Sequence, residues 1–230
     1  MSNFLRRLRI NAEQYGDREA IVFGTQRITY KKLEEETDKL AAALSKRLSG
    51  KQVPVIIYHS RGIDFIKIML AVIKCDCFYI PLEEIYPVDR VRTIYRDINA
   101  EIIISDLLDS DYDMKVFNPE TDSIVEDGSW KAEKIGRNDQ DIIYVMYTSG
   151  TTGMPKGIAI KDENVDNLIN TFGRILYNHF EENINVGLIA PFSFDTSVKQ
   201  IYCALYYAKT LVIADYTVRS FRRKIHDFHN

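Results

Sequence analysis

The stretch Tyr147-Thr-Ser-Gly-Thr-Thr-Gly-Met-Pro-Lys-Gly157 crowds three glycines, four aliphatic hydroxyls and one lysine between two apolar runs. The run before the loop is Ile142–Tyr147 and the run after it is Ile158–Ile160, a pattern that predicts a loop between two buried strands. Glycine lets backbone N–H groups approach an anion, hydroxyls donate to phosphate oxygens, and a lysine adds a mobile positive charge. The loop is therefore predicted to bind polyphosphate, through the hydroxyls of Thr148, Ser149, Thr151 and Thr152 and through Lys156.

The composition is that of a globular chain without a strong bulk charge. Its 230 residues are 46% hydrophobic, which is enough for one large or two small units with a buried core. The formal net charge is −3 and basic residues are scattered among acidic ones, which argues against nucleic-acid or anionic-membrane partners. Lys67, Lys74 and Asp76 break the longest apolar runs well short of a membrane span. We therefore predict a cytoplasmic protein.

The chain contains three cysteines, Cys75, Cys77 and Cys203. An odd number without a secretion signal favours reduced thiols. A Cys-x-Cys pair can begin a metal site, but no second cysteine pair follows and the histidines are not spaced as ligands. We predict that the cysteines are small core residues and that the chain has no metal-binding residue.

Strand and helix patterns alternate along the first half of the chain. Two short strand patterns flank Gly24-Thr25 and predict a hairpin. The alternation that follows predicts right-handed crossovers and a parallel sheet. The expected strands are 20–23, 27–30, 53–58, 77–80 and 101–105, and the expected helices are 31–48, 63–74 and 87–98.

Residues from about 108 to 141 are rich in Asp, Glu, Asn, Ser and Gly and predict an irregular connector. We therefore divide the chain into a first α/β subdomain, residues 1–140, and the start of a second, residues 141–230, which carries the loop. In the second part the expected strands are 142–147, 158–160, 186–190 and 210–214, and the expected helices are 165–176, 197–207 and 218–230.

Glycine, serine and threonine also gather in ordinary tight turns, so the loop has a purely structural alternative. Two nucleotide-binding patterns are excluded. The P-loop pattern G-x-x-x-x-G-K-[ST] fails because Gly150 and Gly153 are too close and Pro155 precedes Lys156. No G-x-G-x-x-G joins a first strand to its helix, as a dinucleotide site requires.

The segment Tyr147–Gly157 closely resembles the signature of the adenylate-forming superfamily: acyl-CoA synthetases, luciferases and the adenylation domains of nonribosomal peptide synthetases. Ile28–Leu33 resembles an early motif of that family, and Leu70–Leu82 with Tyr86–Arg90 resembles the next. Phe194–Ser197 completes the set, and the last two segments look specifically like amino-acid-activating adenylation domains. The resemblance implies the N-terminal part of the adenylate-forming α/β fold, truncated, with parallel or mixed sheets flanked by helices.

Three positions depart from the family pattern. Cys75-Asp76-Cys77 stands where the family usually has small residues, and Glu83-Glu84 stands where Asp-Pro is common. Asp162 falls near a position that is often histidine. We expect these departures to alter local packing and not the class of protein.

The resemblance implies that the carboxylate of an amino acid attacks the α-phosphate of ATP, giving aminoacyl-AMP and pyrophosphate. The phosphopantetheine thiol of a carrier protein would then take the acyl group. Positioning and charge stabilisation would do most of the work, with Mg²⁺ bridging phosphates. Thr152 and Lys156 would support the loop, and Lys156 would follow the leaving pyrophosphate. The implied phosphate-binding residues are Thr148, Ser149, Gly150, Thr151, Thr152, Gly153, Lys156 and Gly157.

The same resemblance places Asp195 where the substrate α-ammonium binds. A carboxylate at the start of a helix is favoured by the helix dipole, so Asp195 can instead be a simple helix cap. Thr196 and Lys199 lie where the family lines the side-chain pocket. A buried ammonium needs an anion, so Lys199 predicts an acidic or strongly polar substrate side chain, unless it extends to solvent.

Three parts that adenylation needs find no match in the sequence: the glutamate that holds Mg²⁺, the ribose-binding aspartate and the lysine of the C-terminal lid. We therefore expect an N-terminal part of an adenylation domain that has no catalytic residue of its own, is inactive alone and can pair with a complementary C-terminal fragment. The alternatives are a noncatalytic nucleotide-binding or interaction module and a fragment of an acyl-CoA ligase relative. Asp195 disfavours the last, because a substrate without an amino group would leave its carboxylate unpaired.

Overall fold

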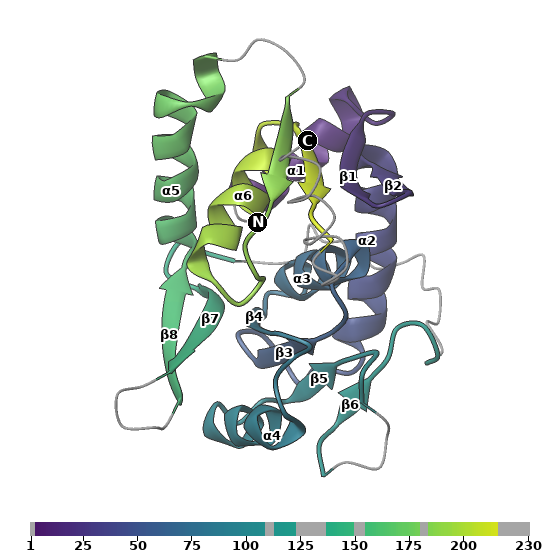
Figure 1. Ribbon diagram of the computed structural model, residues 1–230, viewed down its shortest axis with the longest axis vertical. Helices are drawn as coiled ribbons and strands as arrows, with labels where there is room; N and C mark the ends of the chain where they lie inside the picture. Colours follow the sequence, from purple (N-terminus) through teal and green to yellow (C-terminus); the bar gives the residue numbers. More distant parts are fainter. Residues whose placement is uncertain (1–2, 109–112, 123–136, 150–154, 180–183, 216–230) are drawn as a thin grey trace, which may run out of the picture.

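The structure is a computed structural model that describes residues 3–108, 113–122, 137–149, 155–179 and 184–215. It contains two sheets, one of four strands in the order β2-β1-β10-β9 and one of six in the order β6-β5-β3-β4-β7-β8 (Figure 1). The strands are β1 (Glu19–Phe23), β2 (Gln26–Thr29), β3 (Pro54–Tyr58), β4 (Phe78–Leu82), β5 (Ile102–Ile104), β6 (Val116–Phe117), β7 (Ile142–Ser149), β8 (Pro155–Lys161), β9 (Asn185–Leu188) and β10 (Thr210–Ile213). The helices are α1 (Asn3–Gln14), α2 (Tyr30–Ser45), α3 (Ile63–Lys74), α4 (Val88–Asp97), α5 (Asp162–Ile175) and α6 (Asp195–Tyr206), with a short 3-10 turn at Tyr177–His179.

The centre of the six-stranded sheet is parallel, as the alternating pattern predicted. β3 pairs in parallel with both β4 and β5, whereas β8 runs antiparallel to β7 at one edge. Both faces of the sheet are covered, which explains the nearly continuous apolar runs. Val55 and Ile57 belong to a core shared with helices and the other sheet, while Ile56 and Tyr58 face a second core that contains α4. The mixed α/β class expected from the resemblance is confirmed.

Distant parts of the chain build the four-stranded sheet. β1 pairs in parallel with β10, so that Ile21 lies opposite Leu211. The hydroxyl of Tyr30, which is fully buried, donates to the carbonyl oxygen of Lys209 at 2.7 Å. Both sheets therefore take strands from either side of residue 140. The division of the chain at that residue stays a prediction, and it does not coincide with a boundary between the sheets.

The structure differs from the sequence prediction in three elements. α1 was not expected, although its buried residues Phe4, Leu8 and Asn11 stand at helical spacing. It buries Phe4 against Tyr202 at a ring-centroid distance of 4.6 Å. β6 lies inside the predicted irregular connector and has only two residues, too few for a periodic signal. β8 was expected to be buried, but it lies at the sheet edge and leaves Ile158 52% exposed. The predicted helix 218–230 lies outside the described residues.

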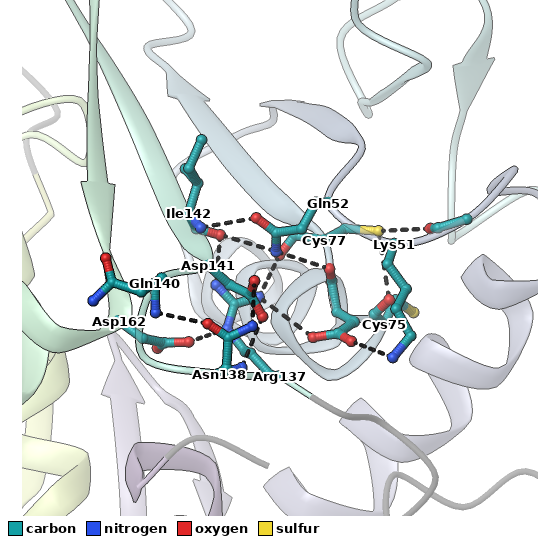
Figure 2. Close-up of polar contacts among 12 residues, drawn as sticks. Lys51, Gln52, Cys75, Cys77, Arg137, Asn138, Gln140, Asp141, Ile142 and Asp162 are labelled. Carbon is teal, nitrogen blue, oxygen red and sulfur yellow. Dashed lines mark hydrogen bonds and ion pairs between the residues drawn. The ribbon is translucent and has the colours of Figure 1, made fainter.

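A buried polar network joins the starts of β4, β7 and α5 (Figure 2). Arg137 donates through Nε to Asp162, through Nη1 to the carbonyl oxygen of Cys77 at 3.0 Å, and through Nη2 to that of Ile142 at 2.5 Å. Burial raises the pKa of Asp162 to about 6, and the nearby Arg137 opposes this rise. The network fixes the base of the β7–β8 hairpin, whose far end is the predicted phosphate loop.

The departure at Cys75-Asp76-Cys77 belongs to the same region. Asp76 has a positive φ of 63°, a conformation that glycine adopts freely and that aspartate tolerates. Its buried carboxylate forms an ion pair with Lys51 at 3.0 Å and lies 4.0 Å from Nη1 of Arg137. All three cysteines are free, Cys77 and Cys203 are buried, and burial raises the pKa of the Cys77 thiol to about 11. These thiols are therefore protonated packing groups at neutral pH.

We expect Gly173→Ala to destabilise the protein, although this change in a helix usually stabilises by about 1 kcal/mol. An added Cβ would lie 1.9 Å from the hydroxyl oxygen of Tyr207, whose ring stacks on Tyr177 at a centroid distance of 5.0 Å. Displacing that ring should lower the free energy of unfolding by about 1–3 kcal/mol, measured by urea denaturation. Gly50→Ala is the matched control, since no atom lies within 4 Å of its added Cβ. An unchanged stability of Gly173→Ala would contradict this packing.

Candidate functional site

The hairpin formed by β7 and β8 presents one wall of the candidate site. In its register Thr148 lies opposite Lys156, and Met146 lies opposite Ile158. Directly opposed residues in antiparallel strands share a face, and residues two apart on one strand share it too. The side chains of Thr148 and Lys156 therefore lie on the face that also carries Met146. Both Thr148 and Lys156 are exposed.

Gly157 has a packing requirement beyond the flexibility predicted for the loop. A Cβ at this position would lie 3.0 Å from Cγ1 of Val145 and 3.1 Å from Cζ of Tyr147. The Tyr147 hydroxyl donates to Asp97 at 2.5 Å and thereby ties β7 to α4. The Tyr147 ring thus lies across the backbone of β8, and glycine provides the space for it.

The structure describes only part of the predicted phosphate loop. Residues 150–154, which include Gly150, Thr151, Thr152 and Gly153, lie outside the described residues, and of Ser149 only the backbone is described. Their phosphate contacts stay predictions. Thr148, Lys156 and Gly157, at the two ends of the loop, can be placed.

A cavity of about 670 Å³ lies beside this hairpin. Its walls come from β7, β8, the segment before α6, and the start of α4 with the residues that precede it. It joins Thr148, from the end of the predicted phosphate loop, to Asp195, the predicted ammonium-binding residue. The lining residues are Tyr86, Arg90, Tyr144, Met146, Tyr147, Thr148, Ile158, Ile160, Ser193, Phe194 and Asp195.

Asp195 is the first residue of α6 and is exposed toward this cavity. The capping position belongs to Phe194, so the interpretation of Asp195 as a simple helix cap is wrong. Its carboxylate accepts a hydrogen bond of 3.4 Å from the hydroxyl of Thr196. The carboxylate also acts on Tyr144 across the cavity: burial, and then the charge of Asp195, raises the pKa of Tyr144 to about 12.

Two side chains from distant parts of the sequence hold the segment before Asp195. Arg61 donates to the carbonyl oxygens of Leu188, Ala190 and Ala214 at 2.8, 3.2 and 2.9 Å. Glu83, where the family commonly has aspartate, accepts from the backbone N–H of Ser193 at 2.8 Å. The segment before Asp195 is thus held by residues that follow β3 and β4, two central strands of the six-stranded sheet.

Thr196 and Lys199 were predicted to line the substrate pocket. Thr196 is exposed, and Lys199 places Nζ 5.8 Å from the ring centroid of Phe172 on α5. Neither residue is among those that line the cavity. Their contact with a substrate side chain stays a prediction.

Sequence reasoning missed several lining residues, chiefly Tyr86 and Arg90. Both belong to the segment Tyr86–Arg90, which was noted as a motif without an assigned role. The guanidinium of Arg90 stacks on the Tyr86 ring at 4.2 Å from its centroid. A tyrosine and an arginine four residues apart at a helix start were the available signal, but only the fold shows that they face Thr148 and Asp195.

The described residues contain no group of three or more His, Cys, Asp or Glu side chains that could hold a metal ion. Within the same ranges, no helix is long and apolar enough to span a lipid bilayer.

A family model described as "AMP-binding enzyme" matches residues 8–229. The chain belongs to the AMP-binding enzyme family. This member is 32% identical over 213 residues to bacitracin synthase 1 of Bacillus licheniformis, an alignment that covers 88% of the chain and 4% of that protein. It is 31% identical over 224 residues to tyrocidine synthase 1 of Brevibacillus parabrevis, which covers 94% of the chain and 20% of the relative. The chain therefore spans a small part of these synthases.

Solved structures show the same fold for this AMP-binding family member. The N-terminal subdomain of Klebsiella oxytoca NpsA, in complex with 3-hydroxybenzoyl-AMSN, matches with a TM-score of 0.80 at 23% identity, covering 98% of this chain and 57% of that one. Holo-PA1221, a nonribosomal peptide synthetase protein containing adenylation and carrier domains, matches with a TM-score of 0.78 at 19% identity, covering 93% of this chain and 36% of that one. The predicted resemblance to the N-terminal part of such adenylation domains is confirmed.

Proposed function

We propose that this chain supplies the amino-acid- and phosphate-binding walls of an ATP-dependent, amino-acid-activating adenylation domain. One observation carries the proposal: a single cavity is lined by both Thr148, at the end of the phosphate loop, and the carboxylate of Asp195. The register pairs Lys156 with Thr148 on one face of the hairpin, which supports a cation for phosphate beside Thr148, although Lys156 does not itself line the cavity. The likeness to peptide synthases supports the same reading.

The described side chains fit the two substrates in complementary ways. The hydroxyl of Thr148 and the ammonium of Lys156 can bind phosphate oxygens, and the Asp195 carboxylate can bind an α-ammonium. Mg²⁺, when bound, would supply positive charge that stabilises the phosphates, and the glutamate that the resemblance assigns to it has no counterpart in this sequence. This chain therefore binds and orients, and residues from elsewhere complete the chemistry.

Nucleotide binding gives the direct test of this proposal. Calorimetric titration of the chain with ATP should show binding that Lys156→Ala weakens about tenfold, since one charge-assisted contact to phosphate is lost. Lys161→Ala is the matched control: it lies on the same strand, but its Nζ donates to Gln140 at 2.6 Å at the far end of the hairpin. Absence of ATP binding, or equal losses in both variants, would count against the phosphate role.

Asp195→Asn should weaken binding of amino acids about tenfold or more while leaving ATP affinity within twofold. The amide keeps the size of the side chain but removes the charge that pairs with an ammonium in a partly dry cavity. The measurement compares L-amino acids with the corresponding acids that lack the amino group. If both classes lose affinity equally, the acyl-CoA ligase alternative gains support.

We propose two partners: a carrier protein that bears phosphopantetheine, and a complementary C-terminal polypeptide. We also propose a cytoplasmic location. Exposed apolar side chains near the cavity mark where such a polypeptide would pack: Ile158 is 52%, Phe194 57% and Ile189 62% exposed. The same exposure favours the second candidate, a noncatalytic interaction module. Amino-acid-dependent pyrophosphate exchange separates them, because it should appear when the C-terminal part of a related adenylation domain is added and never in an interaction module.

A further inference from the structure

The cavity described above contains a second charged side chain that the proposed function does not use. Of the described residues that line it, only Asp195 and Arg90 carry a charge at neutral pH. Asp195 has an assigned partner in the substrate ammonium. Arg90 comes from α4, which lies on the other side of β7 from α6 (Figure 1). Arg90 and Asp195 therefore reach the same cavity from two different helices.

Within the described part of the chain, Arg90 is held by its stack on the Tyr86 ring and is not neutralised by a carboxylate. Its Nε is buried without a hydrogen-bond partner in the described part of the chain, and no described carboxylate forms an ion pair with it. By contrast, Arg92 on the same helix pairs with Asp89 at 2.5 Å. A buried, unsatisfied donor on a charged group is costly, which favours a partner that arrives from the cavity.

The local structure prepares Arg90 for a planar anion. The Tyr86 ring stacks on the guanidinium at 4.2 Å from its centroid, and this contact limits the rotation of the guanidinium. Arg90 also lies in the first turn of α4, where the helix dipole adds positive potential. A guanidinium edge matches the two oxygens of a carboxylate or a phosphate through paired hydrogen bonds.

We propose that Arg90 binds an oxyanion of the ligand that occupies this cavity, and so determines ligand specificity opposite Asp195. This inference rests on the proposed function for the identity of the cavity as the substrate site. Arg90 lines the cavity and Lys199 does not, so Arg90 is the better placed of the two cations to pair with a ligand anion there. The oxyanion is either a phosphate of the nucleotide or pyrophosphate, or a carboxylate of the amino acid.

Calorimetric titration with three probes tests the proposal: inorganic pyrophosphate, L-glutamate and its neutral isostere L-glutamine. Arg90→Gln should weaken one oxyanion probe about tenfold. Arg90→Lys should recover part of that affinity, because it restores charge without the paired donors. A loss for pyrophosphate identifies the phosphate source, and a loss for L-glutamate without a loss for L-glutamine identifies a side-chain carboxylate. Arg92→Gln, whose partner is Asp89, should leave all three affinities unchanged.

Wild-type affinities for all probes in Arg90→Gln, or no binding of either oxyanion to the wild type, would overturn the proposal. If Lys156→Ala weakens ATP while Arg90→Gln changes nothing, the proposed function survives and this inference fails. If L-glutamate binds through Arg90 but ATP does not bind, Arg90 is an oxyanion-binding residue and the proposed nucleotide-binding function fails. Should Arg90→Gln fold poorly, the Nε–H resonance of Arg90 in the wild type gives a second measurement, and it should shift on addition of the bound oxyanion.

Discussion

Replacing Arg137 by alanine is expected to lower the free energy of unfolding by about 3–5 kcal/mol. The substitution leaves the buried Asp162 carboxylate without its cation and removes the Arg137 donor from the carbonyl oxygens of Cys77 and Ile142 (Figure 2). The carbonyl oxygen of Ile142 then keeps only the longer hydrogen bond from Gln52, at 3.3 Å. Removing one member of a buried ion pair is costly because the remaining charge stays in a poorly solvated place. Urea denaturation at pH 7 measures the loss.

Arg96→Ala is the control for this substitution, because Arg96 is 65% exposed in its ion pair with Asp113. An exposed pair of this kind contributes about 0–1 kcal/mol. A loss in Arg137→Ala no larger than that in Arg96→Ala would show that the buried network does not hold the hairpin. Arg137→Ala should also bind ATP more weakly, because the network lies at the base of β7 and β8, the two strands that hold the phosphate loop.

The pKa of Asp162 adds a pH signature to the same experiment. Burial raises that pKa from 3.8 to about 6, so between these values the folded state binds more protons than the unfolded state. Stability from this group is complete below pH 3.8 and is lost as the pH rises through 6. Asp162→Asn should remove this dependence, which amounts to on the order of 3 kcal/mol. A wild-type stability profile that matches that of Asp162→Asn between pH 4 and 6 would contradict the raised pKa.

Arg61→Ala is expected to lower the free energy of unfolding by about 2–4 kcal/mol and to loosen the segment that carries Asp195. Its guanidinium joins the ends of β9 and β10 to the chain before α3 through three carbonyl oxygens, and it lies 4.8 Å from the Phe192 ring centroid. Phe192 in turn stacks on Phe65 at 3.9 Å. Losing the guanidinium removes the shared anchor of these elements.

Hydrogen exchange distinguishes the local effect from the global one. The amide of Ser193, which donates to Glu83, and that of Phe194, which donates to Pro191, should exchange faster in Arg61→Ala under conditions where the fold persists. Arg27→Ala, at an exposed pair with Glu19, should change neither stability nor exchange. Unchanged protection at residues 193 and 194 would show that Arg61 does not position Asp195.

Local sequence patterns predicted much of the fold. The helix expected at 63–74 has these bounds in the structure, and the strands expected around residues 53–58 and 142–147 are present. Such elements can be recognised from the sequence because their apolar periodicity and flanking turn residues all fall within one short segment. Of the two elements that were missed, β6 has only two residues, too few for a period. α1 has a helical spacing of buried residues that was not recognised, and it packs against Tyr202 on α6.

By itself the sequence determined two things: the family, through the loop Tyr147–Gly157, and the parallel α/β class. Both can be recognised from short continuous segments of the chain. The tertiary structure decided which charged groups meet. It set Arg90 and Asp195 in one cavity, placed Lys199 over Phe172, and left β8 at an exposed edge. Pairings between residues far apart in the chain leave no local pattern, since they depend on how whole sheets and helices pack.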